Sequence, residues 1–283
     1  MMWSLWNPMV YPIVGVTQKC MDVRFPRFQG KFFIGCDTGG ENNIIYDLEE
    51  KTILTHMDNI VSSGGDAIWI SGIQGGVYDG LKKNIDHKYR FVQNYIVPPA
   101  VSTDGFFFAI QEEQGWLNSG SFSTKVEVPY PVKKWNPPAL SSCGPVWIDE
   151  QNTVWLYRMR DGVTEQIVQS LDFPRQIISL DSWVFWVEDH YIQGWNCLNA
   201  EKMSIETKVV DRIAPIGIQD QKPLLCWSFW IDEEYGTDIV CSDNRHLQRK
   251  ENQVWPSTDG HGKLMFRESD MILYIDVQES KKP

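Results

Sequence analysis

Short apolar runs separated by polar turn residues recur along the whole chain. The aligned runs are KFFIG from Lys31, AIWIS from Ala67, FFFAI from Phe106, PVWID from Pro145, WVFWV from Trp183, LLCWSFW from Leu224 and KLMFR from Lys263. They are rich in β-branched and aromatic residues, whereas few windows place apolar residues at the helical spacing of i, i+3, i+4 and i+7. The pattern predicts an all-β protein.

These runs are also evenly spaced. Taking Phe32, Ile68, Phe107, Val146, Val184, Leu225 and Leu264 as equivalent positions, the successive spacings are 36, 39, 39, 38, 41 and 39 residues. A period of about 40 residues suits a four-stranded β-propeller blade. The sequence therefore predicts a single-domain, seven-bladed β-propeller over residues 1–283. Six or eight blades, or two packed β-sandwich domains, are the alternatives.

The N-terminal segment is aromatic and uncharged, reading WSLWNPMVYP from Trp3. Only nineteen residues follow Leu264, which leaves room for one further strand in the last unit. We expect a strand at about residues 8–17 to complete the last blade and close the ring, because an open sheet edge exposes unpaired backbone groups. The alternative is that part of this segment protrudes and inserts into a neighbouring molecule.

The first unit resembles a kelch blade. The resemblance rests on FFIG from Phe32, the glycine pair at Gly39 and YDLEEKT from Tyr46, and only SGIQGG from Ser71 echoes it. No Trp-Asp dipeptide closes a unit as in WD repeats, and complete sialidase-type Asp boxes are absent. The resemblance is thus to the β-propeller superfold and to no specific family, and it implies a fold without implying an activity.

The net charge and the cysteine positions bear on which ligands and which cellular compartment we expect. The 26 basic and 37 acidic residues give a net charge of −11, so the broad positive field that holds a phosphate backbone is missing and nucleic acid is not expected as the primary ligand. No apolar run approaches the roughly 20 residues of a membrane helix. The stretch before Lys19 has no basic residue and is interrupted by Pro8 and Pro12, so we do not expect it to be a secretory signal. The six cysteines form no Cys-x-x-Cys pair, which favours reduced thiols in an intracellular compartment or a virion over a zinc site or a disulfide framework.

Catalytic and cofactor motifs are missing from the sequence. The five histidines show no metal-binding spacing, and neither a Gly-x-Ser-x-Gly elbow nor a glycine-rich phosphate loop occurs. We therefore expect no catalytic residue, no cofactor and no bound metal.

The loops that follow the aligned runs are acidic. Their carboxylates are Asp37, Glu41, Glu112, Glu113, Asp149, Glu150, Glu188, Asp189, Asp232, Glu233, Glu234, Asp238, Glu268 and Asp270. Equivalent loops of a propeller lie on one face, so these residues are predicted to bind a basic protein partner or a neighbouring subunit. The competing interpretation is that acidic loops serve only solubility and turn geometry.

The leading functional hypothesis is a non-catalytic structural or recognition platform within a larger assembly. Divergent units without family signatures also suit a virion or phage-tail component. The alternative is a carbohydrate-binding or glycoside-hydrolysing propeller, because paired carboxylates can cleave glycosides and exposed tryptophans can bind sugars.

Overall fold

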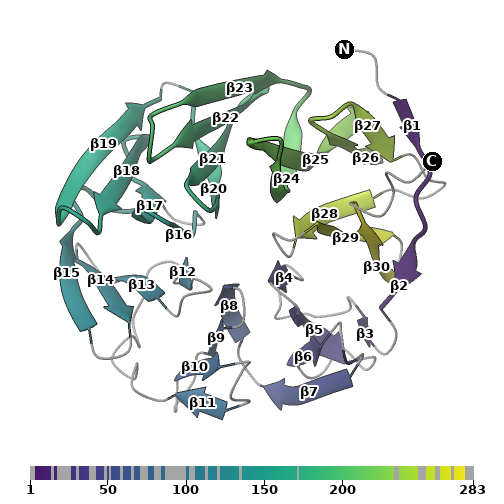
Figure 1. Ribbon diagram of the computed structural model, residues 1–283, viewed down its shortest axis with the longest axis horizontal. Helices are drawn as coiled ribbons and strands as arrows, with labels where there is room; N and C mark the ends of the chain where they lie inside the picture. Colours follow the sequence, from purple (N-terminus) through teal and green to yellow (C-terminus); the bar gives the residue numbers. More distant parts are fainter. Residues whose placement is uncertain are drawn as a thin grey trace. The chain divides into compact units, whose positions relative to one another are not determined.

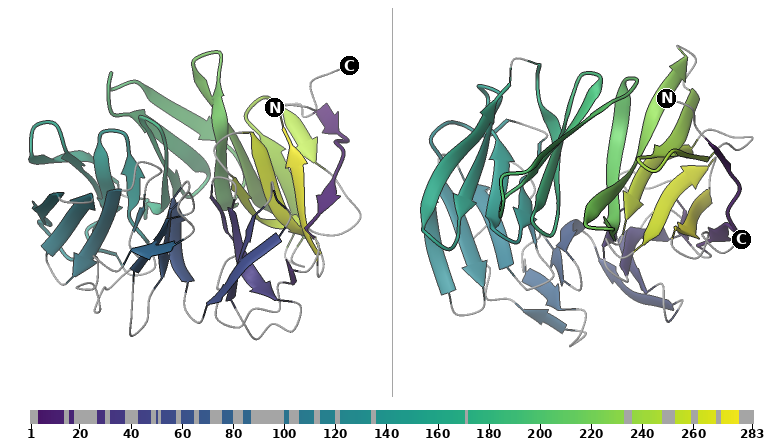
Figure 2. Two further views of the ribbon diagram at one scale, coloured as in Figure 1. Left: turned by 60° about the horizontal axis from the view of Figure 1, so that its bottom comes forward. Right: turned by 45° about the horizontal axis from the view of Figure 1, so that its top comes forward.

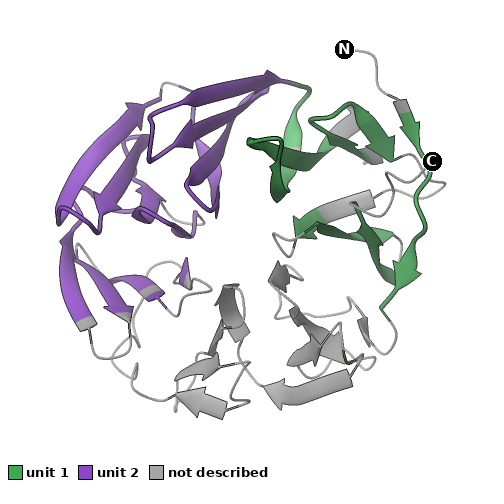
Figure 3. Cartoon of the chain, viewed as in Figure 1, with its two compact units in different colours: residues 1–58, 207–283 green, residues 59–206 purple. Residues whose placement is uncertain are grey.

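The structure is a computed structural model, and it describes residues 4–13, 16–17, 27–29, 32–37, 43–47, 50, 52–57, 60–64, 67–70, 76–79, 84–86, 100–101, 106–111, 114–119, 122–133, 136–170, 172–232, 236–247, 253–258, 262–268 and 271–277. Within these ranges the regular secondary structure is β-strand, and no helix long and apolar enough to cross a membrane occurs. The chain divides into two compact units: Met1–Asp58 with Thr207–Pro283 (unit 1) and Asn59–Glu206 (unit 2) (Figure 3).

The described part of unit 2 forms four antiparallel sheets, and in each the strands follow one another in sequence (Figure 1). The strands are β8 (Ile60–Gly64), β9 (Ala67–Ile70), β10 (Gly76–Asp79) and β11 (Asn84–Asp86); β12 (Ala100–Val101), β13 (Phe106–Gln111), β14 (Gln114–Ser119) and β15 (Phe122–Glu127); β16 (Ala139–Ser141), β17 (Gly144–Ile148), β18 (Thr153–Arg158) and β19 (Val163–Gln169); and β20 (Arg175–Leu180), β21 (Trp183–Glu188), β22 (Tyr191–Asn196) and β23 (Lys202–Glu206). The first strands of successive sheets are in contact, since β12 touches β8 and β16, and β16 touches β20.

In the sheets β16–β19 and β20–β23, burial falls from the second strand to the fourth. Every residue of β17 is buried, β18 is mostly buried, and β19 is half-buried or exposed throughout. The same gradient runs from β21 to β23, whose alternating pattern leaves one face in solvent. Apolar runs such as WVFWV therefore become strands buried on both faces, and the more polar run KMSIE becomes the exposed fourth strand. Figure 2 shows the ribbon from two further sides.

Unit 1 contains three sheets among its described residues. One is ordered β1 (Ser4–Trp6), β27 (Arg245–Leu247), β26 (Gly236–Cys241), β25 (Lys222–Asp232) and β24 (Val210–Gln219). The second is ordered β2 (Tyr11–Pro12), β30 (Met271–Asp276), β29 (Lys263–Glu268) and β28 (Gln253–Thr258). The third is ordered β3 (Val16–Thr17), β5 (Phe32–Asp37), β6 (Asn43–Asp47) and β7 (Thr52–Met57), with β4 (Arg27–Gln29) also paired to β5.

The N-terminal segment supplies the outer strands of two sheets of unit 1. β2 pairs antiparallel with β30, so Tyr11 lies opposite Tyr274 and the two rings stack with centroids 5.2 Å apart. The sequence did not indicate the strand before it: β1 pairs in parallel with β27, and Trp6 lies opposite Leu247. Residues 4–6 and 11–12 thus pair with two sheets of unit 1, so neither strand protrudes from it.

The all-β prediction is confirmed. Each aligned apolar run forms a strand in a different sheet, namely β5, β9, β13, β17, β21, β25 and β29. The number of blades, the closure of a ring and the single-domain boundary stay predictions.

Candidate functional site

Asp149 organises the turn between β17 and β18, one of the acidic loops predicted from the sequence. Its carboxylate is fully buried and accepts hydrogen bonds from the backbone N–H groups of Gln151 (2.9 Å) and Thr153 (2.8 Å) and from the indole N–H of Trp155 (2.8 Å). An aspartate that bonds backbone groups two and four residues on fixes a tight turn. This charge therefore holds the loop in shape, and the expectation that Asp149 faces a partner is corrected by its burial.

The segment before β16 packs against this turn. The backbone N–H of Glu150 donates to the carbonyl of Pro131 (2.9 Å), and that of Lys133 donates to the carbonyl of Ile148 (2.9 Å). The Lys133 ammonium donates to Oδ1 of Asn152 (2.8 Å) and to the carbonyl of Pro174 (3.3 Å). Burial lowers the pKa of Lys133, against the opposing attraction of Asp149. Three loops are thereby tied together.

The loop after β21 lies at the same end of the sheets. Arg175 at the start of β20 is opposite Val187 near the end of β21, so residues 172–174 and 188–190 share that end. Glu188 is half-buried and accepts the indole N–H of Trp186 (2.7 Å), while Asp189 is exposed beside His190 (3.3 Å).

We call residues 129–133, 149–152, 172–174 and 188–191 the unit 2 loop face. Its exposed acidic residues are Glu150, Asp172 and Asp189, and its exposed aromatic residues are Tyr130, Phe173 and Tyr191. The predicted loop acids Glu150 and Asp189 are thus at one end of adjacent sheets and open to solvent. Asp172 and the three aromatic residues were not singled out by the sequence, since nothing in the pattern tells an exposed aromatic from a buried one.

Two predicted acids of unit 1 are buried, and their expected exposure is corrected. Asp238 is within β26 rather than in a loop, and its Oδ2 lies 2.7 Å from Nε2 of His246. Glu268 is the last residue of β29, opposite Gln253 and Met271, and it too is buried. Both positions lie inside the packed sheets, where water and a partner have little access.

The structure does not describe the side chains of the remaining predicted acids. Asp37 and Asp232 end β5 and β25, and only their backbone is described. Glu41, Glu112, Glu113, Glu233, Glu234 and Asp270 lie outside the described residues. Their role in binding a partner stays a prediction.

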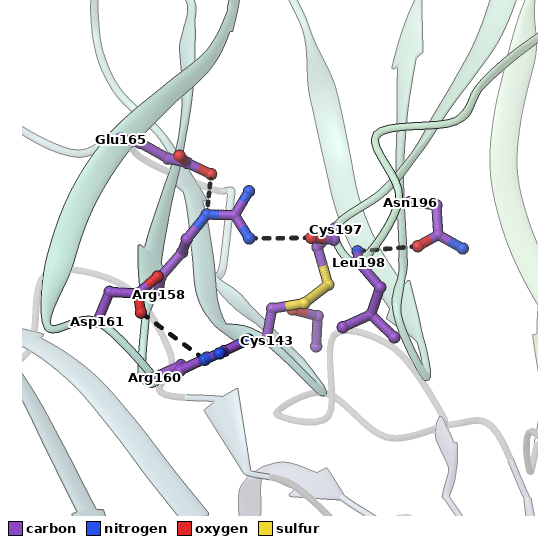
Figure 4. A network of polar contacts seen from close by, with 9 residues as sticks. Cys143, Arg158, Arg160, Asp161, Glu165, Asn196, Cys197 and Leu198 are labelled. Atoms are coloured by element: carbon purple, nitrogen blue, oxygen red, sulfur yellow. Dashed lines mark hydrogen bonds and ion pairs between the residues drawn. A yellow bond between two sulfur atoms is a disulfide. The ribbon is translucent and has the colours of Figure 1, made fainter.

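The opposite end of the same unit 2 sheets carries a disulfide. Cys143, in the turn before β17, is bonded to Cys197, which follows β22 (Figure 4). Arg158 donates to the carbonyl of Cys197 (3.0 Å) and forms an ion pair with Glu165 (2.6 Å), which attaches β18 and β19 to the bridge.

A second disulfide joins Cys226 of β25 to Cys241 of β26, which are direct cross-strand partners. The prediction of reduced thiols is therefore wrong for these four cysteines. Strand pairing brings Cys226 and Cys241 together across 15 residues, and the contact of two sheets brings Cys143 and Cys197 together across 54 residues, which the cysteine spacing alone could not show. The intracellular location inferred from the cysteines loses that support.

No group of three or more His, Cys, Asp or Glu is arranged to hold a metal ion within the residues that the structure describes. The unit 2 loop face offers exposed carboxylates and aromatic rings, and hydrogen bonds of Asp149 and Lys133 hold two of its loops. These groups suit recognition of a cationic surface.

Solved structures share this fold over nearly the whole chain. The β-propeller domain of Cps50 (Swd1) from Myceliophteria thermophila matches 95% of this chain and 100% of its own length, with a TM-score of 0.62 and 14% identity. A chain of the mitotic checkpoint complex matches 95% of this chain and 92% of its own, with a TM-score of 0.62 and 8% identity. The WD40 domain of SCAP from fission yeast matches 97% and 88%, with a TM-score of 0.57 and 9% identity.

These likenesses establish an all-β, propeller-like fold of the kind seen in WD40 domains. At such low identity they show the fold alone. No family model matches the sequence, and no curated protein matches it either. The likeness to WD40 domains arises without the Trp-Asp dipeptides of WD repeats, so it was visible only in three dimensions.

Proposed function

We propose that this chain is a non-catalytic protein-interaction platform within a larger assembly, and that it recognises a basic partner through acidic loops at one end of its sheets. The observation that carries the proposal is the unit 2 loop face. There Glu150, Asp172 and Asp189 are exposed, and hydrogen bonds of Asp149 and Lys133 fix the two loops that carry Glu150 and Asp172.

The rigidity of these loops favours recognition over mere solubility. Asp149 satisfies three donors and the Lys133 ammonium satisfies two acceptors, so the turn has little freedom to lose when a partner binds. A pre-organised surface keeps more of its interaction energy as affinity, because the ordering cost is already met on folding. Exposed carboxylates around it would steer a cationic partner toward this end.

The fold supports the same function. Propellers of the WD40 kind commonly serve as scaffolds for protein partners, and one of the similar chains is part of the mitotic checkpoint complex. Membership of a virion or a phage tail stays a prediction from the sequence alone.

The test is a selection of random twelve-residue peptides displayed on phage against the immobilised full chain. Selected peptides should be rich in arginine and lysine, and their measured affinity should fall steeply as salt rises. The double change Glu150→Gln and Asp189→Asn should weaken binding about fivefold, mainly by slowing association.

The matched control is the double change Asp161→Asn and Asp181→Asn. It removes two exposed charges from the opposite end of the same sheets, and Asp181 shares with Asp189 a left-handed backbone that asparagine tolerates. Binding should be nearly unchanged in this control. Equal weakening by both double changes would mean that the net charge matters and the proposed face does not.

A further inference from the structure

Phe173 is the most unusual residue of the unit 2 loop face. Its side chain is 71% exposed, and its φ of 49° is in the left-handed region, which a bulky residue seldom adopts. Pro174 follows it, and the residue before a proline is ordinarily extended. A conformation this unfavourable persists only where the surroundings hold it, and such residues cluster at functional sites.

Both sides of Phe173 are held by hydrogen bonds. The backbone N–H of Asp172 donates to the Ser170 hydroxyl (3.0 Å). The carbonyl of Pro174 accepts from the Lys133 ammonium (3.3 Å) and from the side-chain amide of Asn136 (3.4 Å). The phenyl ring is therefore presented to solvent by a fixed backbone rather than by a free loop.

One part of the ring already interacts with a cation. The Lys133 nitrogen lies 5.4 Å from the ring centroid, and its hydrogen bond to Asn152 keeps it there. The rest of the ring is open to solvent, so an incoming apolar or cationic group would cover aromatic surface that folding left exposed.

Exposed carboxylates share the unit 2 loop face with the ring. Asp172 is its neighbour in sequence, Asp189 follows the strand end opposite Arg175, and Glu150 belongs to the turn that contributes Asn152. An arginine fits this setting better than a lysine, because its planar guanidinium can stack on a ring while donating to carboxylates at its edge.

We propose that Phe173 is the anchor of the partner site and that it receives an arginine side chain of the basic partner on its open surface. This rests on the proposed function and names the residue that carries most of the affinity. Binding energy at protein interfaces is concentrated in a few aromatic and arginine residues, whereas charges at the rim mainly set the rate of association.

The experiment uses the full chain and a fluorescent, arginine-bearing peptide from the phage selection, with affinity measured by anisotropy. Phe173→Ala should weaken binding about tenfold or more, mainly through faster dissociation. The matched control is Leu198→Ala, which truncates an apolar side chain that is 76% exposed at the opposite end of the same sheets, and it should leave the affinity unchanged.

The peptide offers a test that needs no variant protein. Replacing its arginine by citrulline keeps the shape and removes the charge, and it should abolish most of the binding. Replacing the arginine by lysine should cost several-fold, because the stacked planar group is lost.

The outcomes separate the two proposals. Basic peptides that bind Phe173→Ala as well as the unchanged chain, yet weaken with Glu150→Gln and Asp189→Asn, would overturn the anchor and leave the platform standing. A selection that enriches no basic peptide would overturn both. Arginine-dependent binding that is lost with Phe173→Ala and kept with Leu198→Ala would establish the anchor.

Discussion

Replacing Trp6 by alanine is expected to lower the free energy of unfolding of unit 1 by about 3 kcal/mol. Trp6 ends β1, is only 7% exposed, and packs in a core cluster that includes Leu247 and Ile239. The Arg245 guanidinium lies 4.6 Å from its ring centroid, which adds a cation–π contact. β1 is thus attached to the sheet by one large side chain and a short parallel pairing with β27.

The magnitude follows from two opposing contributions. Truncating a buried tryptophan usually costs about 3–5 kcal/mol. The indole N–H of Trp6 is buried and has no hydrogen-bond partner among the described residues. Removing this unpaired donor is favourable, so the net loss in the free energy of unfolding is smaller. Because β1 is an edge strand, it can also shift into the cavity that the missing ring leaves. We therefore expect a loss of free energy of unfolding of about 3 kcal/mol, the lower limit of that range.

Guanidinium denaturation followed by fluorescence and circular dichroism measures the change in the free energy of unfolding, and thermal unfolding measures the melting temperature. The melting temperature should fall by about 6–12 °C, taking about 2–4 °C per kcal/mol for a unit of this size. Trp6→Phe keeps a stacking ring and removes the unpaired N–H, so it should stay within about 1 kcal/mol of the unchanged chain. Leu5→Ala, at a neighbouring side chain that is 73% exposed, should stay within about 0.5 kcal/mol.

Two results would refute this reasoning. A Trp6→Ala variant as stable as the unchanged chain would mean that β1 is only loosely attached in solution. Equal losses for Leu5→Ala and Trp6→Ala would mean that the strand backbone, rather than the buried ring, provides the stability.

Three further changes test the core of unit 2. Asp149→Ala should cost about 3 kcal/mol in guanidinium denaturation, since it removes a fully buried carboxylate that accepts three hydrogen bonds; a loss below about 1 kcal/mol would contradict that role. Replacing Cys143 and Cys197 by serine should cost about 4 kcal/mol, because the bridge closes a loop across a sequence separation of 54; unchanged stability after reduction of the native chain would show that the bond contributes nothing. Gly194→Ala should lower the melting temperature, because its Cβ would lie 2.5 Å from Cγ of Met203, and an unchanged melting temperature would show that Met203 can move aside.

The sequence predicted the strands whose burial is set by local pattern. PVWID and WVFWV became β17 and β21, which are buried along nearly their whole length, because consecutive β-branched and aromatic residues suit a strand covered on both faces. The prediction of loop residues failed where a strand begins before its first apolar residue. Asp238 reads as a loop residue but belongs to β26, since backbone pairing continues through it.

The candidate site was only partly predictable. The sequence located Glu150 and Asp189 because turn residues follow apolar runs. It could not find Phe173, whose left-handed backbone depends on hydrogen bonds from Lys133 and Asn136 to the next residue. The pairing of Cys143 with Cys197 likewise depends on the contact of adjacent sheets rather than on local pattern.

The division of the chain has a consequence for the order of events during synthesis. Unit 2 is one continuous stretch, so all of its described strands have left the ribosome once the chain has passed Glu206 by the length of the exit tunnel. Unit 1 has to wait, because Leu5 pairs with His246 and Tyr11 pairs with Tyr274, residues that are made more than two hundred positions later. During that interval Trp6 lacks the strands it packs against in the folded unit 1, and an exposed aromatic segment of an incompletely folded chain is prone to aggregation. Slowing translation after residue 206 should therefore lower the yield of native protein more than slowing it before residue 59.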